Sequence, residues 1–303
     1  MSLPDFFIIG APKCGTTTLY NWLGRHPEVN APHKEPCFFS QDIFPTSSLP
    51  THIESLSEYT SIFNFRAATQ RISGEATPKY LYSDMALNEI KRLCPDARVI
   101  VCFRDPVDLV ISLHYQKFRE GEEKESSFVK AWRRTVDHNG TVLSRDANFG
   151  GQPNYYFWGA YGCRLKKLYE LFTADQILLV GLNEIQSDPE TTYKKLIDFL
   201  GIDDDGRTSF GASNVGFKIK RPWLHRFAVF LKRVSAPVLR SLHRARDGRG
   251  LGLLKLLNRY NTEVGAYSIG VSEDLRVEIR EVLLADIEMA ERIFDVYLGA
   301  SQS

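Results

Sequence analysis

A stretch near the N-terminus limits what this chain can fold into more than any other. Four consecutive apolar residues, Phe6–Ile9, predict a buried strand. The next residues form a turn that is rich in glycine and proline and contains Lys13. After the turn, the periodic run from Thr16 predicts a helix. The first N–H groups of a helix have no intrahelical partner, so a strand, such a turn and a helix N-terminus together form an anion site. Three hydroxyl groups and the lysine would complete a cradle for phosphate or sulfate, and the hydroxyls belong to Thr16, Thr17 and Thr18.

The spacing of this turn resembles a nucleotide-binding loop but departs from it at one position. The Walker A loop reads G-x-x-x-x-G-K-[ST]. Gly10 and Gly15 keep the glycine spacing, whereas Thr16 stands where the lysine belongs, and Lys13 lies inside the loop. This arrangement favours phosphate binding without Mg-ATP chemistry. The alternative is an ordinary strand-to-helix turn.

Composition narrows the class of protein. The chain has 303 residues, of which 43% are apolar and 25% charged, as in a globular protein with a sizeable core. The net charge of +1 gives no overall reason to expect nucleic-acid binding. No run approaches the roughly 18 apolar residues of a membrane span, and no signal peptide is recognisable at the N-terminus.

The cysteines predict a compartment rather than a site. The five cysteines are scattered, odd in number and without zinc-finger or C-x-x-C spacing, so we expect reduced thiols in a cytoplasmic protein and no metal cluster. They are Cys14, Cys37, Cys94, Cys102 and Cys163.

Strands and helices alternate along the chain. Strands are predicted at 5–10, 71–76, 98–103 and 176–180. The predicted helices cover 16–25, 84–93, 106–119, 161–172, 188–200 and 273–297. This alternation predicts an α/β protein with a P-loop-like, three-layer fold in which helices flank a central parallel sheet.

A second candidate site follows the strand at 98–103. Arg104 lies at the carboxyl end of this strand, which is the edge where open α/β sheets bind ligands. Asp105 and Pro106 predict the start of a helix, with Asp105 as its N-cap. Ser112 lies about two turns into that helix and could share an anion with Arg104.

Three other segments allow both a functional and a structural interpretation. Pro32 and Pro36 restrain Lys34–Glu35, which could form a site or a surface salt bridge. The stretch 218–259 has many lysines and arginines but a single acid, so it favours an anionic cofactor or acceptor unless it is a solvated face balanced by nearby acids. The aromatic residues 155–158 form either core packing or a lid over an acceptor.

Five segments together resemble a known family. They are residues 12–19, Lys34–Phe39, Val101–Ser112, the helix–strand–helix from Tyr161 to Gly201, and Asn214–Arg221. They resemble the sulfotransferases that use 3′-phosphoadenosine 5′-phosphosulfate (PAPS), and more narrowly the bacterial branch related to heparan-sulfate-type sulfotransferase domains. The match covers residues 5–225 and implies one sulfotransferase domain over 1–303, with a basic helical part at 218–303.

The resemblance implies roles for individual residues. Glu35 would be the general base, with His33 as the rival base, and Lys13 would stabilise charge on the transferred group and the leaving oxygen. Arg104 and Ser112 would grip the 3′-phosphate of the donor. The 5′-phosphosulfate loop would comprise Lys13, Cys14, Gly15, Thr16, Thr17 and Thr18. The late loop that closes over the nucleotide would contribute Phe217, Lys218, Lys220 and Arg221.

The acceptor is less well specified than the donor. The heparan-type pattern has His and Asp where Cys37 and Ser40 stand, and lysine where Ala76 stands, which weakens the expectation of a heparan-like glycan. The sequence is equally compatible with a hydroxyl or an amine as the acceptor group. That group could belong to a glycan, a lipid or a small molecule, either free or bound to a carrier. The alternatives to a sulfotransferase are a P-loop kinase or NTPase and a non-catalytic module that binds nucleotide or a polyanion.

Overall fold

The computed structural model describes residues 2–43, 53–64, 67–211, 217–219, 262–264 and 271–299. The chain forms two compact units. The first comprises Met1–Leu109, Phe157–Asn214 and Ile279–Ser303, and the second comprises Val110–Tyr156 and Val215–Glu278. The single domain over 1–303 stays a prediction.

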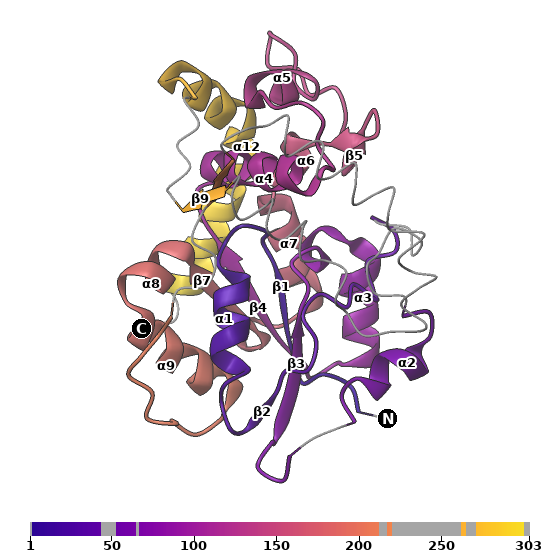
Figure 1. Ribbon diagram of the computed structural model, residues 1–303, viewed down its shortest axis with the longest axis vertical. Helices are drawn as coiled ribbons and strands as arrows, with labels where there is room; N and C mark the ends of the chain where they lie inside the picture. Colours follow the sequence, from indigo (N-terminus) through magenta and orange to yellow (C-terminus); the bar gives the residue numbers. More distant parts are fainter. Residues whose placement is uncertain are drawn as a thin grey trace. The chain divides into compact units, whose positions relative to one another are not determined.

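A five-stranded sheet forms the centre of the first unit (Figure 1). Its order is β2-β3-β1-β4-β7, and every pair of neighbours is parallel. The strands are β1 Phe6–Gly10, β2 Val29–Asn30, β3 Ile72–Ala76, β4 Arg98–Phe103 and β7 Ile177–Gly181. Their residues are mostly buried because helices cover both faces, which confirms the predicted three-layer α/β fold.

The register brings the carboxyl ends of these strands to one edge of the sheet. Phe6 lies opposite Gly74 of β3 and Arg98 of β4. A Cβ atom at Gly74 would lie 2.3 Å from the Phe6 ring, so only glycine fits at this crossing. The segments that follow β1, β2, β3 and β4 therefore start near one another, as ligand-binding loops of parallel sheets do.

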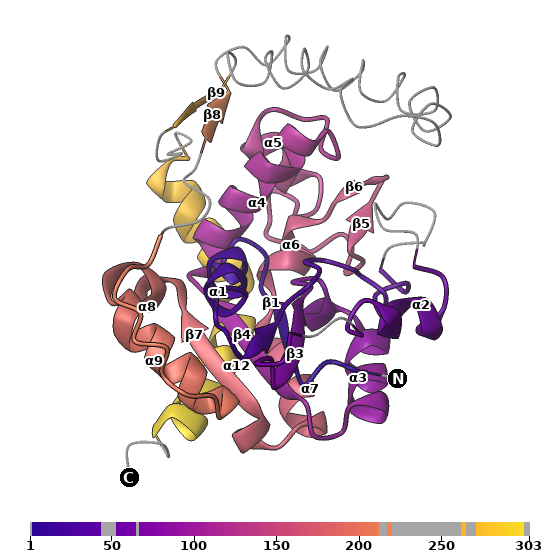
Figure 2. The same cartoon turned by 60° about the horizontal axis from the view of Figure 1, so that its bottom comes forward.

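Helices flank the sheet on both sides. They are α1 Thr16–Leu23, α2 Leu56–Ser61, α3 Asp84–Leu93, α7 Gly162–Leu171, α8 Leu182–Ser187 and α9 Pro189–Leu200. α1, α8 and α9 lie on one side, where the rings of Trp22 and Tyr193 meet at 6.4 Å, and α3 and α7 lie on the other (Figures 1 and 2). On that second side the Nζ atom of Lys167 lies 2.7 Å from a carboxylate oxygen of Asp84.

Local capping explains why the predicted bounds were close. Ser83 accepts a hydrogen bond from the N–H of Ala86 at the start of α3, and Asp188 accepts one from Thr191 at the start of α9. Gly201, at a φ of 65°, ends α9. α8 was not predicted, because it is too short to show a period.

The second unit contains α5 Phe128–Arg133, the two-stranded pair β5 Asn148–Phe149 and β6 Gln152–Pro153, and the pair β8 Phe217–Ile219 and β9 Thr262–Val264. Three helices cross between the units along the chain: α4 Pro106–Glu120, α6 Tyr155–Gly159 and α12 Glu273–Gly299. Within the described residues, no helix combines the length and apolar character needed to cross a bilayer.

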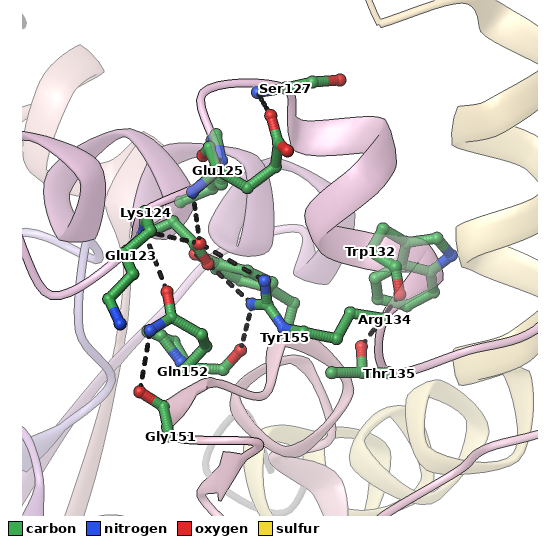
Figure 3. A network of polar contacts seen from close by, with 12 residues as sticks. Glu123, Lys124, Glu125, Ser127, Trp132, Arg134, Thr135, Gly151, Gln152 and Tyr155 are labelled. Atoms are coloured by element: carbon green, nitrogen blue, oxygen red, sulfur yellow. Dashed lines mark hydrogen bonds and ion pairs between the residues drawn. The ribbon is translucent and has the colours of Figure 1, made fainter.

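A buried carboxylate organises the second unit (Figure 3). Glu123 accepts hydrogen bonds from Arg134 at 2.7 Å, from the Tyr155 hydroxyl at 3.0 Å, and from the backbone N–H groups of Lys124 and Glu125 at 2.8 Å. Burial alone would raise the pKa of Glu123, but these donors and the Arg134 charge together hold it below its ordinary value. The carboxylate is thus ionised, paired and structural.

Candidate functional site

The turn between β1 and α1 has the geometry of an anion-binding loop. Gly15 is the N-cap of α1 at a φ of 96°, and among the described residues no side chain caps this helix. The N–H groups of Thr18 and Leu19 both donate to the Gly15 carbonyl, at 2.8 and 3.2 Å, so the first turn of the helix is tight. The N–H groups before them belong to the helix N-terminus, where backbone donors have no intrahelical partner. A Cβ atom at Gly15 would lie 2.7 Å from Ile185 of α8, so glycine is required on two grounds.

The side chains of this loop divide into buried and accessible groups. Thr16 and Thr18 are buried, whereas Lys13 and Thr17 are half-buried. Lys13 has a φ of 67°, a left-handed conformation that is strained for any residue except glycine. The loop therefore brings a lysine, an accessible hydroxyl and the N-terminus of a helix together, while the binding role of these residues stays a prediction.

Cys14 contributes its backbone but not a reactive thiol. The side chain has no exposed surface and donates to the Pro12 carbonyl at 3.4 Å. Burial raises the pKa of the Cys14 thiol to about 12, although the charges of Arg104 and Lys13 oppose this rise. The thiol therefore stays protonated and is no nucleophile at neutral pH.

Arg104 connects the end of β4 to the turn between β1 and α1. Its Nη1 donates to the Lys13 carbonyl at 3.4 Å, and its Nη2 lies 3.5 Å from a carboxylate oxygen of Asp108. The Arg104 carbonyl accepts from the Tyr161 hydroxyl at 2.7 Å. The structure thus brings Arg104 and Lys13 together at the carboxyl edge of the sheet.

Asp105 behaves as predicted and has a further partner. Its carboxylate accepts from the N–H groups of Val107 at 2.9 Å and Asp108 at 3.1 Å, which makes it the N-cap of α4. It also pairs with Arg280 of α12 at 2.5 Å. Asp286 of the same helix accepts from the N–H groups of Gly162 and Cys163 at the start of α7. The last helix, α12, therefore contacts the start of α4 through Arg280 and the start of α7 through Asp286.

The remaining predicted donor-binding residues are placed only in part. Ser112 lies in α4 within the second unit, so its pairing with Arg104 stays a prediction. Phe217 and Lys218 belong to β8, of which the backbone is described. Lys220, Arg221 and most of the basic stretch lie outside the described residues.

The Lys34–Glu35 segment is held against the end of β3. The N–H of Glu35 donates to the Ala76 carbonyl at 2.9 Å, and Lys34 forms a β-bridge with Ala76. The Lys34 ammonium pairs with the Glu35 carboxylate, whose side chain is 44% exposed. Glu35 has a φ of 58° and Cys37 a φ of 55°, so this short segment contains two strained residues.

His33 remains a rival to Glu35 on geometric grounds. Its ring is half-buried, and its Nδ1 atom is buried with no hydrogen-bond partner among the described residues. An imidazole nitrogen that is not engaged elsewhere can accept a proton. Both candidate bases therefore lie in the segment that follows β2.

The positions that depart from the heparan-type pattern are all buried. Cys37 and Ser40 form a local turn in which the Ser40 hydroxyl donates to the Cys37 carbonyl at 3.2 Å. Burial raises the pKa of the Cys37 thiol to about 11. Ala76 has no exposed surface. Small residues at these positions thus serve packing in this chain.

Glu75 is a buried ionisable residue beside the candidate site that the sequence did not single out. It is fully buried at the end of β3, and its carboxyl accepts from the hydroxyls of Tyr59, Thr77 at 2.7 Å and Tyr80 at 3.2 Å. Burial raises its pKa to about 7, although the three hydroxyl donors oppose the rise. The available signal was a glutamate inside a strand whose other residues are apolar or small.

The aromatic cluster is core packing for three of its four members. Tyr155, Phe157 and Trp158 are buried, whereas Tyr156 is half-buried beneath the Arg145 guanidinium. Of the two interpretations of this cluster, the structure favours the core. Among the described residues, no group of three or more His, Cys, Asp and Glu side chains is arranged to hold a metal ion.

The comparisons with known proteins agree with this geometry. The sulfotransferase domain family matches residues 3–211. The chain is 27% identical over 200 residues to mouse (Mus musculus) heparan sulfate glucosamine 3-O-sulfotransferase 3B1, which covers 66% of this chain and 46% of that protein. It is 28% identical to the membrane-associated sulfotransferase kil1 of Dictyostelium discoideum, over 71% of this chain and 59% of that protein.

A solved structure extends the likeness to the fold. The crystal structure of a sulfotransferase from Alicyclobacillus acidocaldarius superimposes with a TM-score of 0.59 at 25% identity, covering 82% of this chain and 98% of that one. The matched stretch spans less than half of the length of the mouse relative.

Proposed function

The chain belongs to the sulfotransferase domain family, and from that premise we propose that it transfers a sulfuryl group from PAPS to a hydroxyl-bearing acceptor. The single observation that carries the proposal is the arrangement at the carboxyl edge of the sheet. There the Lys13 loop, Arg104 and the Lys34–Glu35 segment follow β1, β4 and β2 of one parallel sheet, and Glu35 bonds to the end of β3, the neighbour of β1. Membership of this family favours sulfuryl transfer over the P-loop kinase and the non-catalytic module.

The residues present fit a phosphosulfate donor. An uncapped helix N-terminus beside a lysine and an arginine suits a group with several negative oxygens. Lys13, the hydroxyl of Thr17 and the N–H groups of residues 14–18 would hold the 5′ side, and Arg104 would hold the 3′-phosphate. The donor supplies a sulfuryl group whose transfer resembles phosphoryl transfer, with charge spread over the peripheral oxygens.

Glu35 is the proposed general base. Its carboxylate is accessible, it is next to a lysine that keeps a positive charge nearby, and its backbone is fixed to β3. In this role it takes the proton of the acceptor hydroxyl as the oxygen attacks, while Lys13 and the helical N–H groups stabilise the oxygens that gain charge. His33 is the alternative base.

The state of the cysteines bears on the cellular compartment in which the protein works. All five are free, and four of them are buried. We therefore propose that the protein works in the reducing cytoplasm.

Two measurements test the proposed function. Calorimetric titration of the full chain should show binding of 3′-phosphoadenosine 5′-phosphate (PAP) and much weaker binding of adenosine 5′-monophosphate, which lacks the 3′-phosphate, and of Mg-ATP. Labelled PAPS should transfer its sulfuryl group to an acceptor in a cell extract, and mass spectrometry would identify the product. Equal affinity for PAP and adenosine 5′-monophosphate would exclude the proposed 3′-phosphate site.

A further inference from the structure

The Glu75 carboxyl is joined by hydrogen bonds to three segments that meet at the end of β3. Tyr59 comes from α2, Thr77 from the turn after β3, and Tyr80 from the short 3-10 helix Tyr80–Tyr82. Tyr59 and Tyr80 have no exposed surface, so both hydroxyls depend on protein partners. Glu75 is thus the common acceptor that satisfies this group of buried hydroxyls.

The two tyrosines also contact the segment that carries Glu35. The Tyr80 hydroxyl accepts from the N–H of Phe39 at 3.4 Å while it donates to Glu75. The Tyr59 ring stacks on Phe38 at 4.8 Å and meets Phe39 edge-on at 5.0 Å. A continuous set of contacts therefore runs from the Glu75 carboxyl to the end of the Lys34–Phe39 segment.

That segment needs such an anchor at both ends. Glu35 and Cys37 have positive φ angles, and strained residues of this kind persist only where surrounding contacts over-determine them. At one end the Glu35 N–H is fixed by the carbonyl of Ala76, the neighbour of Glu75 in β3. At the other end the tyrosines hold Phe38 and Phe39. Glu75 is linked to both attachments, as the sequence neighbour of Ala76 and as the hydrogen-bond acceptor of the two tyrosines.

We propose that Glu75 is a positioning residue that holds the Lys34–Phe39 segment, and with it the Glu35 carboxylate, through the hydroxyls of Tyr59 and Tyr80. This inference rests on the proposed function, in which Glu35 is the base. Glu75 itself has no exposed surface and would not touch the acceptor. Its effect is therefore expected in the turnover step and not in donor binding.

The second unit offers a matched control. Tyr155, like Tyr80, is a fully buried tyrosine whose hydroxyl donates to a buried glutamate, here Glu123 at 3.0 Å. The interaction is of the same kind, but its partners stabilise the loop drawn in Figure 3 and include neither Lys13 nor Glu35. Tyr155→Phe thus shows what the loss of one such hydroxyl does to folding alone.

The kinetic test compares Tyr80→Phe, Glu75→Ala and Glu75→Gln with the control, all in the full chain. Tyr80→Phe and Glu75→Ala should lower kcat about tenfold or more, with PAP affinity and donor KM changed by less than about twofold. Glu75→Gln should recover part of the loss, because its amide oxygen still accepts from the tyrosines. Tyr155→Phe should keep kcat within about twofold of wild type. A wild-type kcat in Tyr80→Phe and Glu75→Ala would overturn the proposal.

A second readout does not depend on turnover. Hydrogen exchange of the amides in peptides covering 34–39 should quicken in Tyr80→Phe, while peptides of α3 stay protected. Unchanged exchange there would overturn the proposal even if Glu75→Ala failed to fold. If the wild type transfers no sulfuryl group, the proposed function fails and exchange alone decides the anchoring. If Glu35→Gln is inactive while Tyr80→Phe is fully active, the positioning role fails and the proposed function stands.

Discussion

Replacing Glu75 with glutamine should change how the stability of the protein depends on pH. Burial raises the pKa of Glu75 from its ordinary value of 4.5 to about 7, against the opposing effect of the three hydroxyl donors. Between these two pH values the folded protein keeps a proton that the unfolded chain has already released. The stability that this proton contributes is fully present below pH 4.5 and is lost as the pH rises through 7.

The size of the effect follows from the difference between the two pKa values. One pKa unit corresponds to about 1.4 kcal/mol, so the rise from 4.5 to about 7 corresponds to about 3 kcal/mol of unfolding free energy. The glutamine variant has no such proton. The difference in unfolding free energy between wild type and Glu75→Gln should therefore shift against the wild type by about 3 kcal/mol across this range.

The other ionisable groups near Glu75 leave this window undisturbed. Burial raises the pKa of the Tyr20, Tyr59 and Tyr80 hydroxyls and of the Cys37 thiol, so all four stay neutral from pH 4.5 to 7. The slope can thus be assigned to Glu75.

Urea unfolding measured at several pH values would provide the assay. Glu123→Gln is the matched control, because donors hold the pKa of that buried glutamate below its ordinary value. The stability that Glu123 contributes is present above that ordinary value and is lost only as the pH falls through the lowered pKa. The difference in unfolding free energy between wild type and Glu123→Gln should therefore stay constant between pH 4.5 and 7, because both proteins keep Glu75. The same pH dependence in wild type and Glu75→Gln would refute the reasoning.

Three further predictions concern the donor loop and the base. Arg104→Ala should weaken PAP binding about 10- to 100-fold, because it removes one or two charge-assisted hydrogen bonds to the 3′-phosphate. The same calorimetric titration should show unchanged binding of adenosine 5′-monophosphate. Gly15→Ala should destabilise the protein by about 1–3 kcal/mol, whereas Gly150→Ala, which also has a positive φ but no neighbour within 4 Å of its Cβ, should cost less in thermal unfolding. Glu35→Gln should keep PAP affinity and lose turnover by about 100-fold or more. A near wild-type rate in that variant would point to His33, and His33→Ala would then lose the activity instead.

The sheet and its flanking helices could be predicted because their signals are local. Arg98–Phe103 is an unbroken apolar run after its first residue, and it forms β4 with those bounds. Asp84–Leu93 has an apolar stripe and a serine before it, and it forms α3 with those bounds. The sequence also predicted that Arg104 lies at the carboxyl end of its strand, and the structure adds its contact with the Lys13 carbonyl at that edge.

Contacts between distant segments could not be predicted in the same way. The Glu75 carboxyl is surrounded by hydroxyls from α2, from the turn after β3 and from Tyr80, and no spacing in the sequence indicates that these segments converge. Asp286 caps α7 from a helix more than 100 residues later in the chain. A single sequence shows that a carboxylate is present, but burial and partners decide whether it is a surface charge or a buried anchor.

The strained residues connect the fold to the proposed chemistry. Among the residues that the structure describes, the non-glycine positions with positive φ are Lys13, Glu35 and Cys37, and the first two are the residues proposed to stabilise charge and to take the proton. Each is held by the neighbouring strand: Arg104 after β4 bonds to the Lys13 carbonyl, and Ala76 of β3 accepts from the Glu35 N–H. Because strain relaxes once such contacts are lost, the positions of both side chains depend on the residues that make those contacts. Activity should therefore be sensitive to changes at the ends of β3 and β4, and measuring turnover alongside PAP binding separates that loss of position from a loss of the donor site.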